Sequence, residues 1–233
     1  MAAEGSGFNG FKPEAIQFLR DLAEHNDRAW FQPRKAEYER LLKEPMEALV
    51  ADLDLRFRER GIPLEGDPRH SIFRIYRDTR FSRDKSPYKT NIGASLPWVE
   101  GRTTDGAPHG NGAYLHFQPG RSFAGGGMHM PDRPRLEAFR RAVVDEPDRV
   151  RAALEDPAFL ATFGPVGSHD TLKRVPPGYP ADHPMAELLK GKDVTFGRTL
   201  TDEEFLSPAL AETLVNDFAT ALPVFRFLAS LEG

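Results

Sequence analysis

Apolar residues recur at helical spacing in the first quarter of the chain and again beyond residue 133. The spacing predicts a helix over about 12–24 and a long helical region over about 34–60, which Gly61 ends. Pro45 is expected to kink that region or to open its second helix. The same spacing returns over about 133–145, 147–162 and 184–190. A last helical region follows Thr201 and Glu204, which have the spacing of a capping box, and Pro223 is expected to split it.

The middle of the chain carries β-branched and aromatic residues in short runs, which predict strands over 72–76, 91–99, 113–118 and 122–129. Pro119-Gly120 signals a turn, so the last two runs form a hairpin that sets Tyr114 opposite Gly125. A further strand is expected over 193–200. No crossover of helix length separates the central strands, which indicates antiparallel pairing.

This order of elements predicts an α+β fold with a central antiparallel sheet over about residues 70–130, flanked by N-terminal and C-terminal helices. We expect a flexible N-terminus over residues 1–10 and a single α+β domain over 11–233.

Composition narrows the classes of function. Hydrophobic residues make up 39% and charged residues 28%, as in ordinary globular proteins, and the net charge of -4 gives no overall attraction to nucleic acid or anionic membranes. The absence of cysteine excludes thiol catalysis, cysteine-ligated zinc and disulfides. The sequence shows neither a signal-peptide pattern nor an apolar run of about 18 residues, so we expect a cytoplasmic location and no membrane partner. The sequence makes no prediction of oligomeric state.

A basic stretch over residues 69–89 stands out on this acidic chain. It holds seven Arg or Lys against two Asp, a local balance of 7 − 2 = +5. If 72–76 is a strand, Phe73 and Ile75 anchor it in the core while Arg74 faces a cleft or solvent. After Tyr76 the alternation breaks, which indicates an irregular segment that presents its side chains.

Three interpretations of the basic stretch stay open. Guanidinium and ammonium groups suit carboxylate or phosphate, so the stretch predicts a site for a small anionic ligand. A nucleic-acid-binding or processing module is the second interpretation. The third is a non-enzymatic scaffold in which the charges form a structural salt-bridge network.

The residues expected to bind the anionic ligand come from the basic stretch, a glycine run and a second basic loop. They are Arg74, Arg77, Arg80, Lys85, Tyr88, Lys89, Gly126 and Arg174. Whether the protein is an enzyme stays open, and no catalytic residue is assigned. If it is one, Asp78, Asp84 and His116 are the candidates for proton transfer. No cofactor is predicted.

Other motifs carry little chemistry. Gly125-Gly126-Gly127 is neither a P-loop nor a dinucleotide fingerprint and is more typical of close strand packing. Ser168-His169-Asp170 has the composition of a catalytic triad, but contiguous residues cannot converge as a triad must. His116 and His129 lie on neighbouring predicted strands and could share a metal with His70 or an aspartate. Satisfied strand histidines are the commoner outcome, so no metal site is predicted.

Several segments together resemble one family. The string over 74–90, Arg-Ile-Tyr-Arg-Asp-Thr-Arg-Phe-Ser-Arg-Asp-Lys-Ser-Pro-Tyr-Lys-Thr, is similar to the signature of the family catalogued as domain of unknown function 2461. Further segments fit it in the right order: Asn-Asp-Arg-Ala-Trp-Phe at 26–31, Ala-Tyr-Leu-His-Phe at 113–117, the glycines at 125–127, Leu-Lys-Arg-Val-Pro-Pro-Gly-Tyr at 172–179, and His-Pro at 183–184 ahead of Leu-Leu-Lys at 188–190. Asn91 departs from the bulkier or histidine residue expected there. The resemblance covers roughly residues 10 to 200. It implies that the basic stretch, the triple glycine and Lys173-Arg174 share one site, and it supplies no catalytic residue.

Overall fold

A four-stranded antiparallel sheet forms the centre of the protein within the residues that the computed structural model describes, 7–80, 82–100 and 111–231. The strands lie side by side in chain order: β1 Ile92–Pro97, β2 Asn111–Phe117, β3 Phe123–Met128 and β4 Val194–Thr199. This sheet with helices before and after it confirms the predicted α+β fold. Residues 1–6 of the predicted flexible N-terminus lie outside the described ranges.

The β2–β3 hairpin forms at the predicted turn. The backbone N–H of Arg121 donates to the carbonyl of Gln118 at 2.8 Å, and Gly120 adopts a φ of 69°, which glycine tolerates without strain. The turn fixes the register, and Tyr114 lies opposite Gly125 as predicted. β4 pairs with β3, although several helices and a long loop separate the two strands in the sequence.

The N-terminal helices follow the predicted pattern, with a π-helical segment as an addition. Asp27 caps the second helix by accepting the backbone N–H of Trp30 at 2.9 Å. Pro45 opens the last helix of this group, directly after a π-helical segment. The elements are α1 Pro13–Glu24, α2 Arg28–Phe31, the 3₁₀ turn Gln32–Arg34, α3 Lys35–Tyr38, the π-helix Glu39–Lys43 and α4 Glu44–Glu59.

The later helices begin where their capping residues stand. Thr201 and Glu204 form the predicted capping box, and Pro223 lies in the first turn of the last helix. The predicted helix over 147–162 is two helices, because Asp156 accepts two backbone N–H groups and starts a new helix before Pro157. The elements are α5 Arg133–Asp145, α6 Pro147–Leu154, α7 Pro157–Phe163, α8 Ala186–Lys190, α9 Asp202–Leu206, α10 Leu210–Thr220 and α11 Leu222–Ala229.

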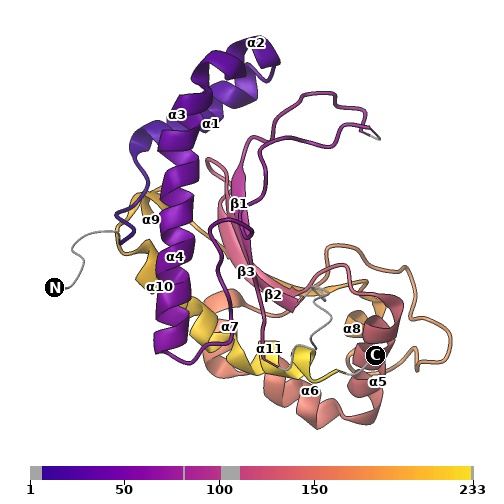
Figure 1. Ribbon diagram of the computed structural model, residues 1–233. Coiled ribbons are helices and arrows are strands. Elements are labelled where there is room, and N and C mark those ends of the chain that lie inside the picture. Colours follow the sequence, from indigo (N-terminus) through magenta and orange to yellow (C-terminus); the bar gives the residue numbers. More distant parts are fainter. Residues whose placement is uncertain (1–6, 81, 101–110, 232–233) are drawn as a thin grey trace.

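Helices cover one face of the sheet. Phe196 of β4 packs edge-on against Phe225 of α11 and Phe163 of α7, with ring centroids 5.4 and 4.8 Å apart. Behind this layer, Phe57 of α4 contacts Phe218 of α10 at 6.2 Å. Figure 1 shows α4, α10, α7 and α11 gathered on the same side of the strands. The opposite face of the sheet is therefore available to solvent or to a ligand.

The predicted strand over 72–76 is wrong. Only isolated bridges form there, between Ile72 and Ala94 and between Tyr76 and Tyr88. Phe73 is 44% exposed rather than a core anchor, whereas Ile75 is buried as predicted. The segment leaves the edge of β1 and pairs with its own return, where Pro87 has no N–H to extend a ladder.

None of the described helices is both long and apolar enough to cross a membrane.

Candidate functional site

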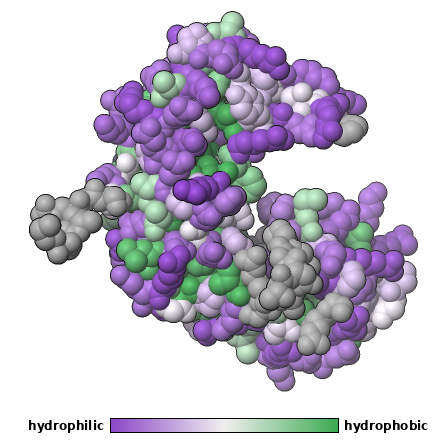
Figure 2. Space-filling model, in the orientation of Figure 1, coloured by the Kyte–Doolittle hydropathy of each residue, from purple (hydrophilic) through white to green (hydrophobic). Residues whose placement is uncertain are grey.

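The open face of the sheet forms the floor of a groove of about 1450 Å³. Strand alternation brings mostly small side chains to this face, and among the positions that line the groove four are glycine and three are serine or threonine. These floor residues are Ser95, Pro97, Gly112, Tyr114, His116, Phe123, Gly125, Gly127, Thr195, Gly197 and Thr199. Figure 2 shows the molecule deeply hollowed on the side away from the covering helices. The small side chains at most of these positions keep the floor low and leave room for a ligand.

A hydrogen-bonded group lies at one end of this floor. The hydroxyl of Tyr114 is 3.2 Å from Nδ1 of His116, and the amide nitrogen of Asn91 is 3.4 Å from the same atom. Nε2 of His116 is 3.2 Å from Oε1 of Gln118. Because the Gln118 oxygen only accepts, we assign the His116 proton to Nε2 and leave Nδ1 as the acceptor.

Burial keeps this group neutral. It lowers the pKa of His116, partly offset by the hydrogen bond to Gln118, and it raises the pKa of Tyr114. Both side chains are uncharged near neutral pH. They can donate and accept hydrogen bonds to a ligand, and His116 can accept a proton.

A lysine lies beside this group at the rim of the groove. Nζ of Lys89 is 5.2 Å from the ring centroid of Phe73, and that ring packs edge-on against Tyr114 at 5.9 Å. Lys89 makes no ion pair with the residues that the structure describes, and neither does Arg74. Burial, and then the charge of Arg74, lower the pKa of Lys89.

Two other arginines of the basic stretch are bound to carboxylates. Arg80 donates from Nε and Nη2 to Asp78 at 3.0 and 2.7 Å. Arg77 pairs with Asp84 and with the hydroxyl of Ser86. These contacts hold both carboxylates as anions. The hydrogen bond from Arg80 lowers the pKa of Asp78, and the backbone N–H of Ser86, followed by Arg77, lowers the pKa of Asp84 to about 2.

The groove gathers some of the sequence-predicted residues and leaves others apart. Its lining includes Arg77, Asp78, Lys89, His116 and the backbone of Gly126. The missing side chain of Gly126 faces the covering helices, because a Cβ there would lie 2.8 Å from the ring of Phe225.

The other predicted residues lie outside the lining, and three of them are exposed: Arg74, Arg80 and Asp84. Tyr88 is buried and packs on Phe31, with ring centroids 4.1 Å apart. Lys85 donates to the carbonyl of Thr79 at 2.9 Å and so braces its own loop. Arg174 lies exposed on the loop between α7 and α8.

Sequence reasoning missed Phe73 and Asn91 as parts of the groove and considered Tyr114 only for its place opposite a glycine. The alternation of Gly112, Tyr114 and His116 along one strand was the signal that could have found Tyr114.

At the opposite end of the strands, two histidines and an aspartate converge. His129 follows β3, His169 lies in the loop after α7, and Asp193 precedes β4. One ligand atom from each lies within 4.8 Å of the other two, and of the described residues these could hold a metal ion. His70, which the sequence set near His116 and His129, instead pairs with Asp67.

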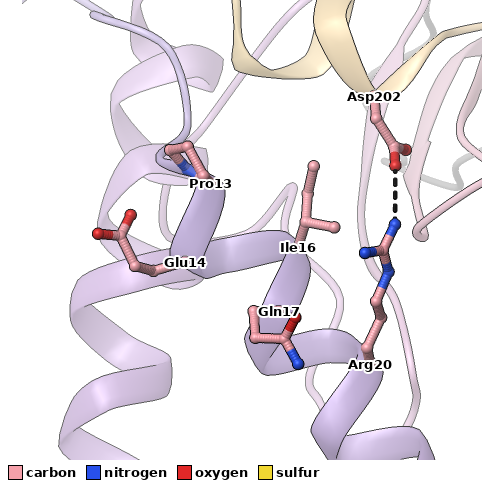
Figure 3. A pocket seen from close by; sticks show the side chains of 6 residues that line it. All are labelled: Pro13, Glu14, Ile16, Gln17, Arg20 and Asp202. Atoms are coloured by element: carbon pink, nitrogen blue, oxygen red, sulfur yellow. Dashed lines mark hydrogen bonds and ion pairs between the residues drawn. The ribbon is translucent and has the colours of Figure 1, made fainter.

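A smaller hollow of about 530 Å³ lies between α1 and α9. Figure 3 shows its one drawn interaction, in which Nη2 of Arg20 lies 3.4 Å from Oδ2 of Asp202. Arg20 is exposed and Asp202 is half-buried, so this hollow offers an ion pair near the surface and little else.

Comparison with known proteins places most of the chain in one family. The family described as conserved hypothetical protein (DUF2461) matches residues 14–227. Neither the curated proteins nor the solved structures contain a match. The match covers nearly the whole sequence and confirms the resemblance carried by the basic stretch: the chain belongs to the DUF2461 family.

Proposed function

We propose that the protein binds a small ligand bearing a carboxylate or phosphate in the groove on the open face of the sheet. The observation that carries this proposal is Lys89, a half-buried ammonium with no ion-pair partner among the described residues. A partly desolvated charge is stabilised by a counterion, and a bound anion supplies one.

Arg74 strengthens this argument. Its guanidinium makes no ion pair within the described part of the chain, and its positive charge lowers the pKa of Lys89 and contributes to lowering that of Asp78. Two like charges that repel each other both gain from an anion placed near them. Lys89 therefore forms the anion end of the proposed site, and Arg74, which is exposed and lies outside the groove lining, would contact the anion from the solvent side.

The body of the ligand would lie along the floor toward Tyr114 and His116. These neutral groups offer a hydroxyl and an imidazole, and Asn91 offers an amide, so a polar ligand can hydrogen-bond there. The ring of Phe73 adds an apolar contact at the rim. We propose no reaction at this site.

The structural-network interpretation accounts for another part of the basic stretch. The pairs Arg77–Asp84 and Arg80–Asp78 support a role for these arginines in fixing the irregular loop. For this reason the proposed anion contacts rest on Arg74 and Lys89 and not on the whole stretch. No observation specifically favours the nucleic-acid alternative.

The test compares Lys89→Gln with Lys35→Gln, which removes an exposed lysine on α3 that does not line the groove. Binding of inorganic phosphate, pyrophosphate and citrate is measured by titration calorimetry in chloride buffer. We expect at least one probe to bind the wild type and Lys35→Gln, and to bind Lys89→Gln at least tenfold more weakly. Equal binding by Lys89→Gln, or no binding of any probe to the wild type, would contradict the proposal.

The salt dependence of binding distinguishes the nucleic-acid alternative from a site for a small anion. Binding to duplex DNA weakens with a log–log slope of about -0.9 per phosphate neutralised, so a contact over several phosphates is steeply salt-dependent. A compact pocket with two cations responds far less. A steep dependence with an oligonucleotide, together with no binding of the small anions, would favour the nucleic-acid alternative.

The absence of cysteine supports a reducing compartment, and the cytoplasm is the location that we propose.

A further inference from the structure

We propose that His129, His169 and Asp193 bind a divalent transition-metal ion, with Zn²⁺ as the ion that suits this ligand set. Two imidazoles and one carboxylate match the preferences of zinc and of neighbouring first-row metals. This proposal does not rest on the anionic ligand, because the three residues lie at the other end of the strands from Lys89.

The distances suit a shared ion as well as the direct contacts that these side chains make without one. Oδ2 of Asp193 lies 3.4 Å from Nδ1 of His129 and 3.3 Å from Nδ1 of His169. Charge-assisted hydrogen bonds are shorter, at about 2.7–2.9 Å. Two ligand atoms on a tetrahedral zinc, each at about 2.0–2.1 Å from the metal, lie about 3.3 Å apart. Each imidazole nitrogen therefore already lies at this spacing from Oδ2 of Asp193, and all three ligand atoms lie within 4.8 Å of one another.

The aspartate is fixed in place before any metal binds. Asp193 is only 6% exposed, and its Oδ1 accepts a hydrogen bond from the backbone N–H of His169 at 2.9 Å. The other oxygen, Oδ2, faces the imidazoles. Ser168 ties the two segments together, because its hydroxyl oxygen accepts the backbone N–H of Lys192 at 3.1 Å and of Asp193 at 3.2 Å. Such outer contacts orient metal ligands and are a regular part of metal sites.

One polar group competes with the ion: the hydroxyl of Thr195 is 3.2 Å from Nδ1 of His169. This hydroxyl can donate to the imidazole in the metal-free protein and must turn away when the nitrogen coordinates.

The two histidines form the solvent-exposed side of the proposed metal site. Their side chains are 61% and 66% exposed, and both line the groove. Their rings meet edge to face at 76°, so they approach the shared point from different directions. Three protein ligands leave a coordination position for water or for a ligand, as in catalytic rather than structural zinc sites.

The test uses the full chain without a polyhistidine tag, after dialysis against a chelator. Co²⁺ is titrated while visible absorption is recorded, and Zn²⁺ binding is measured by calorimetry. We expect one equivalent of either ion to bind, with Co²⁺ giving d–d bands of a low-coordinate site. His129→Gln and His169→Gln should each weaken binding at least tenfold.

His70→Gln is the matched control, because His70 is an exposed histidine that contacts one aspartate, Asp67, outside the groove lining. It should bind Co²⁺ as the wild type does. Thermal unfolding without metal checks that each variant is folded, and saturating Zn²⁺ should raise the unfolding temperature of wild type but not of His169→Gln. Absence of saturable binding to the wild type, or unchanged binding in both groove variants, would overturn the proposal.

Discussion

Asn26 is predicted to hold the basic stretch against the N-terminal helices. Its Nδ2 donates to the carbonyl of Tyr88 at 2.9 Å, and its Oδ1 accepts the backbone N–H of Tyr88 at 3.0 Å. One amide side chain thus satisfies both backbone groups of a buried tyrosine 62 positions away. Asn26→Ala removes both bonds and provides no replacement.

The magnitude follows from these two bonds. Each partly buried hydrogen bond contributes about 0.5–1.5 kcal/mol net, so the pair contributes about 2 kcal/mol. For a protein of this size, 1 kcal/mol corresponds to about 2–4 °C in Tm. We therefore expect Asn26→Ala to unfold about 4–8 °C below the wild type. Asn26→Asp keeps the acceptor but loses the donor, and should fall between the two.

Scanning calorimetry measures the effect, with Asn216→Ala as the matched control. Asn216 accepts one exposed hydrogen bond from Arg60 on the surface of α10, and alanine is a better helix former there. The control should melt close to the wild type. If Asn26→Ala also melted within about 1 °C of the wild type, the amide would not be the link that we infer.

Three further predictions address other parts of the fold. Gly126→Ala should lower the free energy of unfolding measured in urea by about 1–3 kcal/mol, because the new Cβ would lie 2.6 Å from a carbonyl oxygen of β2 and 2.8 Å from a phenylalanine ring of α11. Unchanged stability would refute this close packing. Arg198→Met removes the ion-pair partner of Asp217, whose pKa is already raised by burial, so Asp217 should bind a proton more readily in the folded variant than in the unfolded chain. The variant should therefore lose stability relative to wild type as pH rises from about 4 to 7, and a stability difference that does not depend on pH would contradict this prediction. Asp84 should titrate near pH 2 by NMR, and in Arg77→Gln its midpoint should rise part of the way toward the usual value; a fixed midpoint would show that Arg77 is not its partner.

Local signals made most of the elements predictable. The capping box at Thr201, the proline positions at 45 and 223 and the turn at Gly120 act through their immediate neighbours, and each stands where the sequence indicated. The run over 72–76 has strand-like residues, but its pairing depends on where the chain returns after Pro87. A run of five residues does not reveal which segment it will pair with.

The site was predictable only in part for the same reason. Arg174 stays outside the groove lining, and nearby on the same loop Tyr179 donates to Glu137 of α5 at 2.6 Å, a contact between distant segments that spacing does not reveal. His129 and Asp193 meet because Met128 of β3 pairs with Val194 of β4, and a predicted strand carries no information about its partner. The basic stretch was visible because its residues are contiguous.

The contact between α4 and α10 has a consequence for the order in which the chain can fold. Arg56 and Glu212 form an ion pair across more than half of the sequence, with Nη1 and Oε2 2.6 Å apart. The fourth strand β4 and the covering helices α10 and α11 all follow the first three strands in the sequence. A nascent chain therefore exposes the apolar face of β1, β2 and β3 until these later elements have been made. Such high contact order predicts slow folding, and a chain truncated before β4 should aggregate rather than fold.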